Sequence, residues 1–392
     1  MTNLFILAFQ SLIFYVRIVK SFIHATALVI GTAIGAGFLA LPLSGAHLNV
    51  PLIILATLIC IFVTYRSSVM AVDLNAFYQS SASLDKLCRI HVGKTVFIIA
   101  MTSLYLLSLS FLTGYFACFS DMLCAFLPVN RSIGIVASAC GLFLILSLRT
   151  HLFSNLNSLF VFAFLAAILI ILLQISTSCS SGTIETQTNL RELPCFLPIL
   201  FASFTMQTVC PYIYKNLDGQ KKTVCRALFL GCLIPGLIYA LWMICVLKTA
   251  SEDPTFWQRL RAHEISVGEL IAFLCDRLPY ASVGAVLKTV TALGVVTSAI
   301  GYGIGLLQSL QNLLPKPLAR FVICFLPAGI NLFSPNLFIH ILTFIGMISA
   351  VFTIFVPYYL TVRHMKQRSL SGLFCFLFGL TVVICEILYE WK

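Results

Sequence analysis

The sequence predicts an all-α polytopic membrane protein with about eleven transmembrane helices, and three observations support this prediction. Of the 392 residues, 60% are hydrophobic and only 9% are charged. Soluble domains are roughly half apolar and about one quarter charged, so no packed core could bury this much apolar surface. The apolar residues also form long runs without alternation, which is typical of spanning helices and not of barrel strands.

The charged residues fit this class. The formal net charge is +11, but the basic residues stand in short loops between apolar runs. This distribution is typical of membrane topology, so we expect the lipid bilayer as a partner and no nucleic acid. The 15 cysteines include no C-x-x-C pair and lie mostly inside apolar runs. They are interpreted as small buried thiols, and we expect no metal site, disulfide framework or cofactor.

The N-terminal residues 1–20 are interpreted as a preamble, and residues 21–392 as a single transmembrane domain. Met1–Val16 is apolar, but no positive segment precedes it, and Arg17 and Lys20 follow it. This order is wrong for a cleaved signal peptide. Sixteen helical residues would reach only about 24 Å, short of the roughly 30 Å hydrocarbon core. We interpret this stretch as an interfacial or partly disordered segment. The alternative is an extension upstream of the true start.

The apolar runs of spanning length are justified in order by the criterion of about twenty residues. Those before the polar loop Ser178–Leu193 are Ser21–Gly45, Pro51–Asp73, Thr95–Leu127, Ile133–Leu148 and Leu156–Ser176. Those after it are Phe196–Tyr214, Val224–Leu247, Ala281–Leu310, Leu318–Leu332, Asn336–Thr361 and Leu370–Tyr389. Glu386, near the end of the last run, is expected at the membrane interface.

The basic residues predict the orientation. With the N-terminus in the cytoplasm, fifteen Lys and Arg residues fall on the inner side and eight on the outer side. Three of the eight lie in the long loop Thr249–Pro279, where the rule has least weight. The N-terminus is therefore predicted in the cytoplasm and the C-terminus outside. Apolar residues recur at helical spacing in that loop, which predicts one or two amphipathic helices over the outer face, either as a lid or as plain connectors.

The first span breaks helix rules. Its segment GTAIGAGFLALP, Gly31–Pro42, concentrates Gly31, Gly35 and Gly37 before a proline. Each glycine costs roughly 1 kcal/mol of helix preference relative to alanine. Gly31 and Gly35 form a G-x-x-x-G, so close helix–helix packing is one interpretation. The other is a discontinuous helix, whose free N–H groups near Gly35–Gly37 would face an anion such as a carboxylate.

The sixth span has a matching irregularity. In ASFTMQTVCPYIYKNLDG, Ala202–Gly219, the residues Thr205, Gln207, Thr208 and Pro211 gather at mid-span depth. Polar side chains and a missing backbone donor are costly there unless they line a cavity, although a proline kink alone is an alternative. The two irregular spans are five apart, as expected if helices one to five and six to ten are inverted repeats.

At this point the residues resemble a family. GTAIGAGFLALP is similar to the first-helix signature of the bacterial hydroxy/aromatic amino acid permeases, and closest to that of their tyrosine-specific members. Weaker similarity lies in Pro198–Gly219, Val296–Leu307 and Phe325–Pro335, and the resemblance covers essentially residues 21–390. It implies a five-plus-five inverted-repeat amino acid transporter with broken helices 1 and 6. One departure is that Ser203–Thr208 lacks the glycine and histidine that this family often carries in the sixth-helix break.

The resemblance also implies a substrate site. Backbone N–H groups of Ala36 and Gly37 would hold a carboxylate, and carbonyls near Ile34 and Ser203–Phe204 would hold an ammonium group. Met206 and Gln207 would lie beside the side-chain pocket, since an aromatic substrate needs apolar walls and one polar group. A side chain at Gly37 is expected to fill the space of the ligand. The implied substrate-binding residues are Ile34, Gly35, Ala36, Gly37, Ser203, Phe204, Thr205, Met206 and Gln207.

A coupling site is implied in the same way. In sodium-coupled relatives, hydroxyls at the positions of Thr297 and Ser298 join backbone carbonyls around one ion, and oxygen ligands suit a hard cation. Hydroxyls in membrane helices also bond back to their own carbonyls, so packing is the alternative. Asp121 and Tyr115 match an acidic residue and a tyrosine of the family's third helix. The implied coupling-ion residues are Gly31, Ile34, Gly294, Thr297, Ser298 and Asp121.

These features predict a secondary transporter that imports an aromatic amino acid, tyrosine before tryptophan or another neutral amino acid, across a bacterial inner membrane. A proton, or alternatively sodium, is the expected coupling ion. A membrane enzyme is disfavoured because the seven histidines lie mostly at span ends or in loops, without H-E-x-x-H or G-x-S-x-G. A channel would need rings of like charge or a symmetric carbonyl filter, and an ATP-driven pump would need a Walker motif.

Overall fold

The computed structural model describes residues 2–35, 37–126, 129–178, 190–265, 267–277, 281–311, 313–333 and 345–390. Over these ranges the chain is helical throughout and contains no β-strand. Within these described ranges, nine helices are long and apolar enough to cross a membrane, and a tenth span is formed if the bent pair at the first break counts as one. The predicted all-α polytopic fold is therefore confirmed over the described residues.

The first half of the chain supplies four candidate spans, with the bent pair counted as one, a shorter apolar helix and one short connecting helix. They are α1 (Thr2–Ala33), α2 (Gly37–Gly45), α3 (Val50–Phe77), α4 (Leu84–His91), α5 (Lys94–Phe126), α6 (Arg131–Ser147) and α7 (Thr150–Ser178). Helix α1 runs without interruption through residue 20, where the preamble was expected to end. Helix α6 matches the predicted span Ile133–Leu148 but has only 17 residues.

The second half begins with the interrupted span and ends with α18. Its elements are η1 (Leu190–Glu192), α8 (Leu193–Ser203), η2 (Gln207–Val209), α9 (Cys210–Asn216), α10 (Lys221–Ala250), α11 (Pro254–Arg261), α12 (Val267–Arg277), α13 (Ala281–Leu310), α14 (Lys316–Phe333), α16 (Ile345–Ala350), η3 (Val351–Phe355), α17 (Val356–His364) and α18 (Leu370–Glu390). Elements α16, η3 and α17 form one span whose middle is a π-helical turn.

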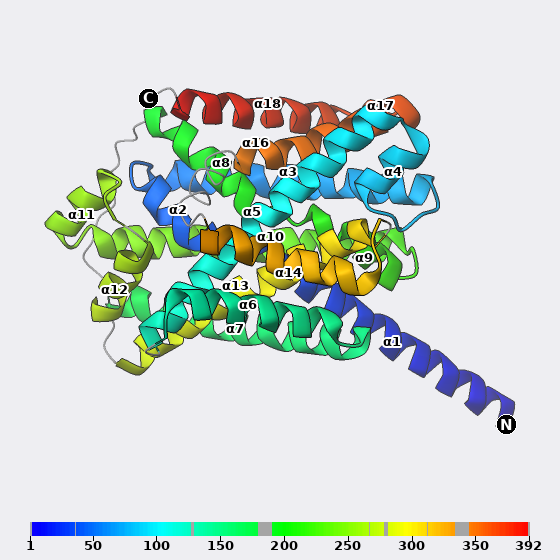
Figure 1. Cartoon of the computed structure of the whole chain (residues 1–392), viewed down its shortest axis with the longest axis horizontal. Coiled ribbons are helices and arrows are strands. Elements are labelled where there is room, and N and C mark those ends of the chain that lie inside the picture. Colours follow the sequence, from blue (N-terminus) through cyan, green and yellow to red (C-terminus); the bar gives the residue numbers. More distant parts are fainter. Residues whose placement is uncertain are drawn as a thin grey trace.

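The helices form one bundle with distinct ends (Figure 1). Helix α1 begins at one end of the long axis, and α18 finishes at the other. Helices α4 and α9 lie toward the end where α1 begins, whereas α11 and α12 lie at the opposite end. This arrangement agrees with the predicted sidedness of the loops relative to one another, because α11 and α12 were expected on the face opposite to the N-terminus.

Asp253, directly before α11, connects α11 to α12. Asp253 is the N-cap of α11, accepts hydrogen bonds from the backbone N–H groups of Thr255 and Phe256, and pairs with Arg277 of α12 at 3.0 Å. The Thr255 hydroxyl and the backbone donors, together with Arg277, hold the pKa of this carboxyl below its usual value. One or two amphipathic helices were predicted in this loop, and the structure has two, which one carboxylate joins.

Candidate functional site

The first span is broken in the middle. Helix α1 ends at Ala33 and α2 begins at Gly37, with a bend of 43° between Ile18–Ala33 and Gly37–Gly45. Glycines at positions 31, 35 and 37 lower the helix preference over this stretch. The first-turn N–H groups of α2 have no acceptor within their own helix, and the carbonyl groups at the end of α1 have no donor within theirs. Ala36, a predicted carboxylate contact, lies outside the described residues.

The glycines before this break allow α1 to approach its neighbours closely. A Cβ atom on Gly31 would lie 2.8 Å from Val161 Cγ2 and 3.0 Å from Thr297 Cβ. A Cβ on Gly35 would lie 2.9 Å from the Ser298 hydroxyl and equally close to the ring of Tyr115, distances that side chains do not tolerate. The helix break and the G-x-x-x-G packing, which were alternatives in the sequence, therefore occur together.

The sixth span is interrupted at Phe204–Met206. Helix α8 ends at Ser203, and the chain resumes helical structure in η2 at Gln207. The Gln207 side chain fixes this interruption, since its amide donates to the Ser67 hydroxyl at 2.8 Å and its oxygen accepts from the Met206 N–H at 3.1 Å. All residues from 203 to 210 are buried. Gln207 thus holds the backbone of the break by hydrogen bonds to the protein itself.

The two breaks lie against each other. Gly37 packs on Ser203, and a Cβ atom on Gly37 would lie 2.8 Å from Ser203 Cβ. A side chain at Gly37 would therefore meet Ser203, and the expectation that it would also fill the space of a ligand stays a prediction. Glycine is required at position 37 so that α2 can approach α8.

Two buried tyrosines connect the breaks, and sequence reasoning missed both. The Tyr239 hydroxyl of α10 lies 2.5 Å from the Ala33 carbonyl and 2.9 Å from the Ser203 carbonyl, so it donates at the ends of both half-helices. The Tyr302 hydroxyl of α13 donates to the Thr205 carbonyl at 2.7 Å. A tyrosine in the middle of an apolar span needs a hydrogen-bond partner, and this requirement was the signal available in the sequence.

Several buried polar atoms near the breaks lack partners. Among the described residues, the Thr205 hydroxyl and the Trp242 indole N–H make no hydrogen bond, although both residues are almost completely buried. The Trp242 ring packs edge-on against Phe38 of α2 at 5.4 Å, one residue after Gly37. Leaving such a group unpaired costs roughly 1–3 kcal/mol, so each needs an explanation.

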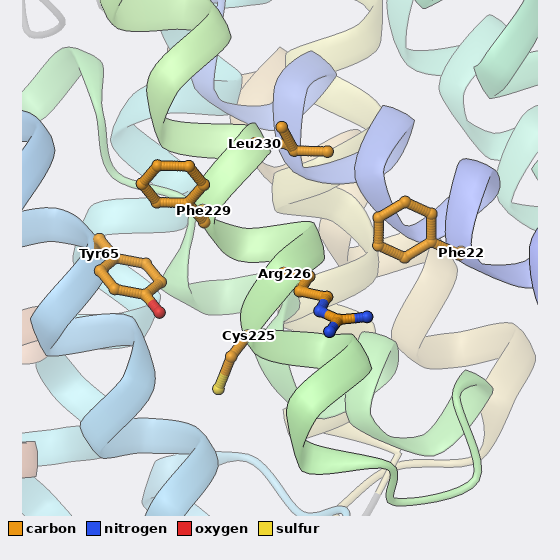
Figure 2. Close-up of a pocket in the computed structure, with 6 residues that line it drawn as sticks. All are labelled: Phe22, Tyr65, Cys225, Arg226, Phe229 and Leu230. Carbon is orange, nitrogen blue, oxygen red and sulfur yellow. The ribbon is translucent and has the colours of Figure 1, made fainter.

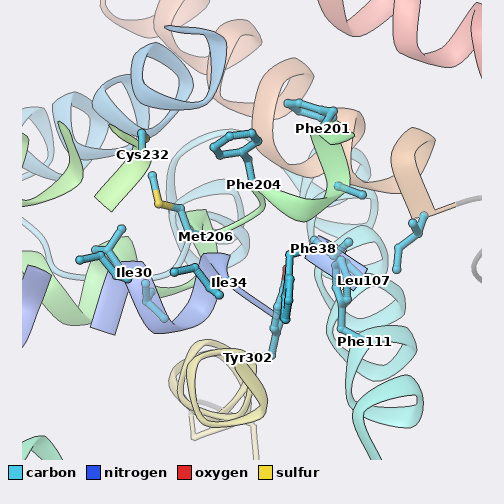
Figure 3. Close-up of a cluster of buried hydrophobic side chains, with 14 of the residues drawn as sticks. Ile30, Ile34, Phe38, Leu107, Phe111, Phe201, Phe204, Met206, Cys232 and Tyr302 are labelled. Carbon is cyan, nitrogen blue, oxygen red and sulfur yellow. The ribbon is translucent and has the colours of Figure 1, made fainter. Parts of the chain in front are cut away.

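Aromatic and aliphatic side chains surround the breaks (Figure 3). Figure 3 shows Ile30 and Ile34 of α1 near Met206, with Phe38 and Phe111 close to Tyr302. Phe111 stacks on Tyr302 with ring centroids 4.5 Å apart, and Phe204 packs edge-on against Tyr239 at 5.0 Å. The predicted residues Ile34, Phe204 and Met206 are all fully buried here. The surroundings are apolar and aromatic, with the polar groups restricted to helix ends and a few side chains.

The structure brings together five of the six predicted coupling residues and places the sixth elsewhere. Five of them lie together where α1 meets α13, and they are Gly31, Ile34, Gly294, Thr297 and Ser298. Ser298 donates to the Gly31 carbonyl at 2.6 Å, whereas Thr297 donates to its own helix, to the Leu293 carbonyl at 2.9 Å. Ser298 thus donates to one of the carbonyls that the resemblance implies as an ion ligand, and Thr297 follows the back-bonding alternative.

Asp121 does not join this cluster. It lies near the end of α5, its side chain is 63% exposed, and it forms an ion pair with Arg131 at 3.1 Å. The carboxylate is therefore a surface group apart from the α1–α13 cluster, and its assignment to the coupling site stays a prediction. Two other carboxylates are buried instead: Asp85 of α4 accepts from the Ser309 hydroxyl at 2.6 Å, and Glu386 of α18 accepts from the Gly346 N–H at 3.2 Å.

Glu386, which was expected at the membrane interface, is buried between helices. Its carboxylate caps the N-terminal end of α16, where the N–H groups of Gly346 and Met347 both donate to it. A carboxylate at the positive end of a helix is stabilised by the helix dipole and by these donors. The sequence did not predict this capping role of Glu386. An apolar run shows that a helix spans the membrane, but not which other helix end packs against its acidic residue.

Almost the whole chain is similar to proteins of known function. The model of the tryptophan/tyrosine permease family matches residues 19–388. Tyrosine-specific transport system 1 of Haemophilus influenzae is 25% identical over 357 residues, covering 86% of this chain and 86% of that protein. The tryptophan-specific transport protein of Pseudomonas aeruginosa is 24% identical and covers 94% of this chain and 92% of its own length. Glutamine transporter 2 of Aliivibrio fischeri is 22% identical, with 88% and 90% covered.

A solved structure shares the fold. The manganese transporter of Eremococcus coleocola superposes with a TM-score of 0.59 at 10% sequence identity, covering 94% of this chain and 85% of that chain. At this identity the likeness concerns the arrangement of helices alone.

Proposed function

Because this chain belongs to the tryptophan/tyrosine permease family, we propose that it is a secondary active transporter that imports an aromatic amino acid, tyrosine in the first place, across the inner membrane. The observation that carries this proposal is the meeting of three helix ends of suitable polarity. The positive end of α2 begins at Gly37, and the negative ends of α1 and α8 finish at Ala33 and Ser203. Oriented helix ends of both signs match the two charges of a zwitterion without a buried ionised side chain.

The side chain of the substrate has a matching environment. Phe38, Phe111, Phe204 and Tyr302 provide apolar and aromatic surface around the breaks. We assign the unpartnered Thr205 hydroxyl and Trp242 N–H to the polar groups of the substrate, the phenol of tyrosine above all. A site built to hydrogen-bond one hydroxyl discriminates strongly against an analogue that lacks it. Rocking of one helix group against the other around the broken spans would alternate access to the two sides.

Tryptophan is the second candidate substrate, because the family includes a tryptophan-specific protein at similar identity and coverage. The test is uptake of radiolabelled tyrosine, tryptophan, phenylalanine and glutamine into vesicles that contain the purified protein. We expect tyrosine uptake to exceed phenylalanine uptake severalfold, since the two differ only in the hydroxyl. Equal uptake of both, or preferred uptake of glutamine, would contradict the assignment of Thr205 and Trp242.

We further propose that protons drive this uptake. Two carboxylates lie buried in the described bundle, at Asp85 and Glu386, and buried acids are the usual proton carriers within membranes, whereas the hydroxyls of Thr297 and Ser298 both donate to backbone carbonyls. Imposing a pH gradient and a sodium gradient separately on the same vesicles tests this proposal. Uptake should accelerate with an inward proton gradient and remain unchanged with sodium, and the reverse result would establish sodium coupling.

The proposed orientation places the N-terminus in the cytoplasm and the C-terminus in the periplasm. The excess of basic residues on the N-terminal side supports it, as does the position of α1's start and α18's end at opposite ends of the bundle (Figure 1). Single cysteines at positions 220 and 258, in a background without the native cysteines, should react with a membrane-impermeant maleimide only at position 258. Labelling at 220 alone would reverse the orientation.

A further inference from the structure

A groove on the outside of the bundle lies apart from the broken spans. It has a volume of about 350 Å³ and is lined by Phe22 of α1, Tyr65 of α3, and Cys225, Arg226, Phe229 and Leu230 of α10. Figure 2 shows Tyr65 and Phe22 on either side of α10, with Arg226 between them. Three helices that are distant in sequence therefore form this groove, and α10 supplies most of its lining.

The walls of the groove are apolar and open to the exterior. The Phe229 side chain is 45% exposed and packs edge-on against Tyr65, with ring centroids 5.6 Å apart. Leu230 and Phe22 continue the apolar surface. In a chain that spans a bilayer, a surface of this kind contacts lipid chains, so the groove is shaped for hydrocarbon and not for a soluble metabolite.

One end of the groove is cationic. Arg226 is exposed, and its guanidinium forms no hydrogen bond or ion pair with any residue that the structure describes. It stands in the second turn of α10, close to the predicted membrane boundary, and Lys222 lies one turn before it on the same face. The neighbouring acid, Asp73, is already neutralised by Lys221 at 2.7 Å. The groove therefore carries uncompensated positive charge at the depth of lipid headgroups.

We propose that this groove binds an anionic phospholipid, whose phosphate pairs with Arg226 and whose acyl chain follows Tyr65, Phe229 and Leu230. An arginine offers planar paired donors that match two phosphate oxygens, and its charge favours an anionic headgroup over a zwitterionic one. The lipid would connect α1, which ends at the first break, to α10, which carries Tyr239 and Trp242. This inference concerns a surface separate from the proposed substrate site and does not depend on the substrate.

Native mass spectrometry of the purified full-length protein tests the proposal. The probes are phosphatidylglycerol and phosphatidylcholine with identical acyl chains, titrated separately into detergent. Wild-type protein should retain phosphatidylglycerol more tightly, and Arg226→Gln should weaken that retention about tenfold, the value of one charge-assisted hydrogen-bonded pair. Arg368→Gln is the matched control, because Arg368 is also exposed, lies in the loop between α17 and α18, and does not line the groove. It should leave retention unchanged.

A second arm separates a lipid from a free phosphate. Glycerol phosphate, which has the headgroup chemistry without acyl chains, should not displace bound phosphatidylglycerol at equal concentration. Phe229→Ala should weaken retention of both lipids about threefold by removing part of the apolar wall. Equal retention of the two lipids by wild-type protein, unchanged retention in Arg226→Gln, or displacement by glycerol phosphate would each overturn the proposal. Size-exclusion profiles of all variants confirm that they remain folded.

Discussion

The two broken spans achieve an interruption by different means. The first break, between α1 and α2, contains glycines and has no hydrogen-bonding side chain at Gly31, Gly35 or Gly37. The second, between α8 and η2, contains Thr205 and is followed by Gln207 and Thr208 of η2, and the Gln207 side chain holds its backbone. The first break depends on the absence of side chains and the second on their presence.

The two breaks therefore contribute different features to the site. Glycines let the backbone of α1 and α2 approach Ser203, Ser298 and Tyr115, so the first break provides helix ends and close contacts. The second break provides a hydroxyl that has no partner among the described residues, at Thr205. We therefore expect substitutions in the first break to affect folding and transport together, and substitutions in the second to affect substrate choice more than stability.

The largest effect is expected at Gly37. In Gly37→Val, the added side chain meets Ser203 Cβ at less than van der Waals distance, so α2 must move away from α8. We expect loss of uptake together with destabilisation of about 1–3 kcal/mol, the usual cost of overpacking. Uptake assays and thermal stability of the purified variant measure the two effects.

A compensating substitution sharpens this result. Gly37→Ala combined with Ser203→Gly removes the two atoms nearest to the added Cβ and leaves the third, the backbone Cα of residue 203, at 3.2 Å. Stability should be restored in the double variant relative to Gly37→Ala alone. If the double variant is no more stable than the single one, Ser203 is not the contact that requires glycine.

A smaller effect, restricted to transport, is expected at Thr205. Thr205→Val keeps the shape and removes the unpartnered hydroxyl, so stability should change by less than about 1 kcal/mol. Tyrosine uptake should fall about fivefold to tenfold while phenylalanine uptake stays constant, which inhibition curves for both substrates will show. Thr57→Val is the control, because the Thr57 hydroxyl is buried and bonds back to the Ile53 carbonyl. An equal loss for both substrates would contradict a role in selectivity.

Tyr239→Phe tests the connection between the breaks. It removes the hydroxyl shared by the Ala33 and Ser203 carbonyls, which should cost about 1–3 kcal/mol of stability because buried acceptors lose their donor. Uptake should decrease for all substrates alike, by a smaller factor than in Gly37→Val. Unfolding in denaturant, followed by tryptophan fluorescence, measures the stability. An unchanged midpoint would show that the two carbonyls do not need this hydroxyl.

The smallest effects distinguish the carboxylates. Asp85→Asn and Glu386→Gln remove the charge of the buried acids, so each should weaken the response of uptake to an imposed pH gradient if that acid carries the proton. Asp121→Asn is the exposed control and should leave the response unchanged. Initial uptake rates at several gradient sizes provide the comparison. If only Asp121→Asn lost the response of uptake to the pH gradient, the surface acid Asp121 and not a buried one would take part in coupling.

Much of the fold was predictable from the sequence because bilayer chemistry acts locally. A spanning helix must satisfy its own backbone hydrogen bonds in about twenty apolar residues, so α3, α5, α7, α10, α13 and α18 can be located without any tertiary information. The breaks were predictable for the same reason, since the glycines before Pro42 and the polar cluster at Thr205–Thr208 conflict with an uninterrupted helix. The pairing of those breaks followed only from their spacing of five spans.

What the tertiary structure decided is which groups meet across helices. No local pattern shows that Ser203 occupies the space beside Gly37, that Tyr239 donates to both breaks, or that Ser298 donates to the Gly31 carbonyl. The same holds for the acids: Asp121 and Glu386 both stand near span ends in the sequence, yet one is exposed and the other buried. The apolar run determines that a helix crosses the membrane, but its rotation and its neighbours depend on packing between helices that are distant in sequence.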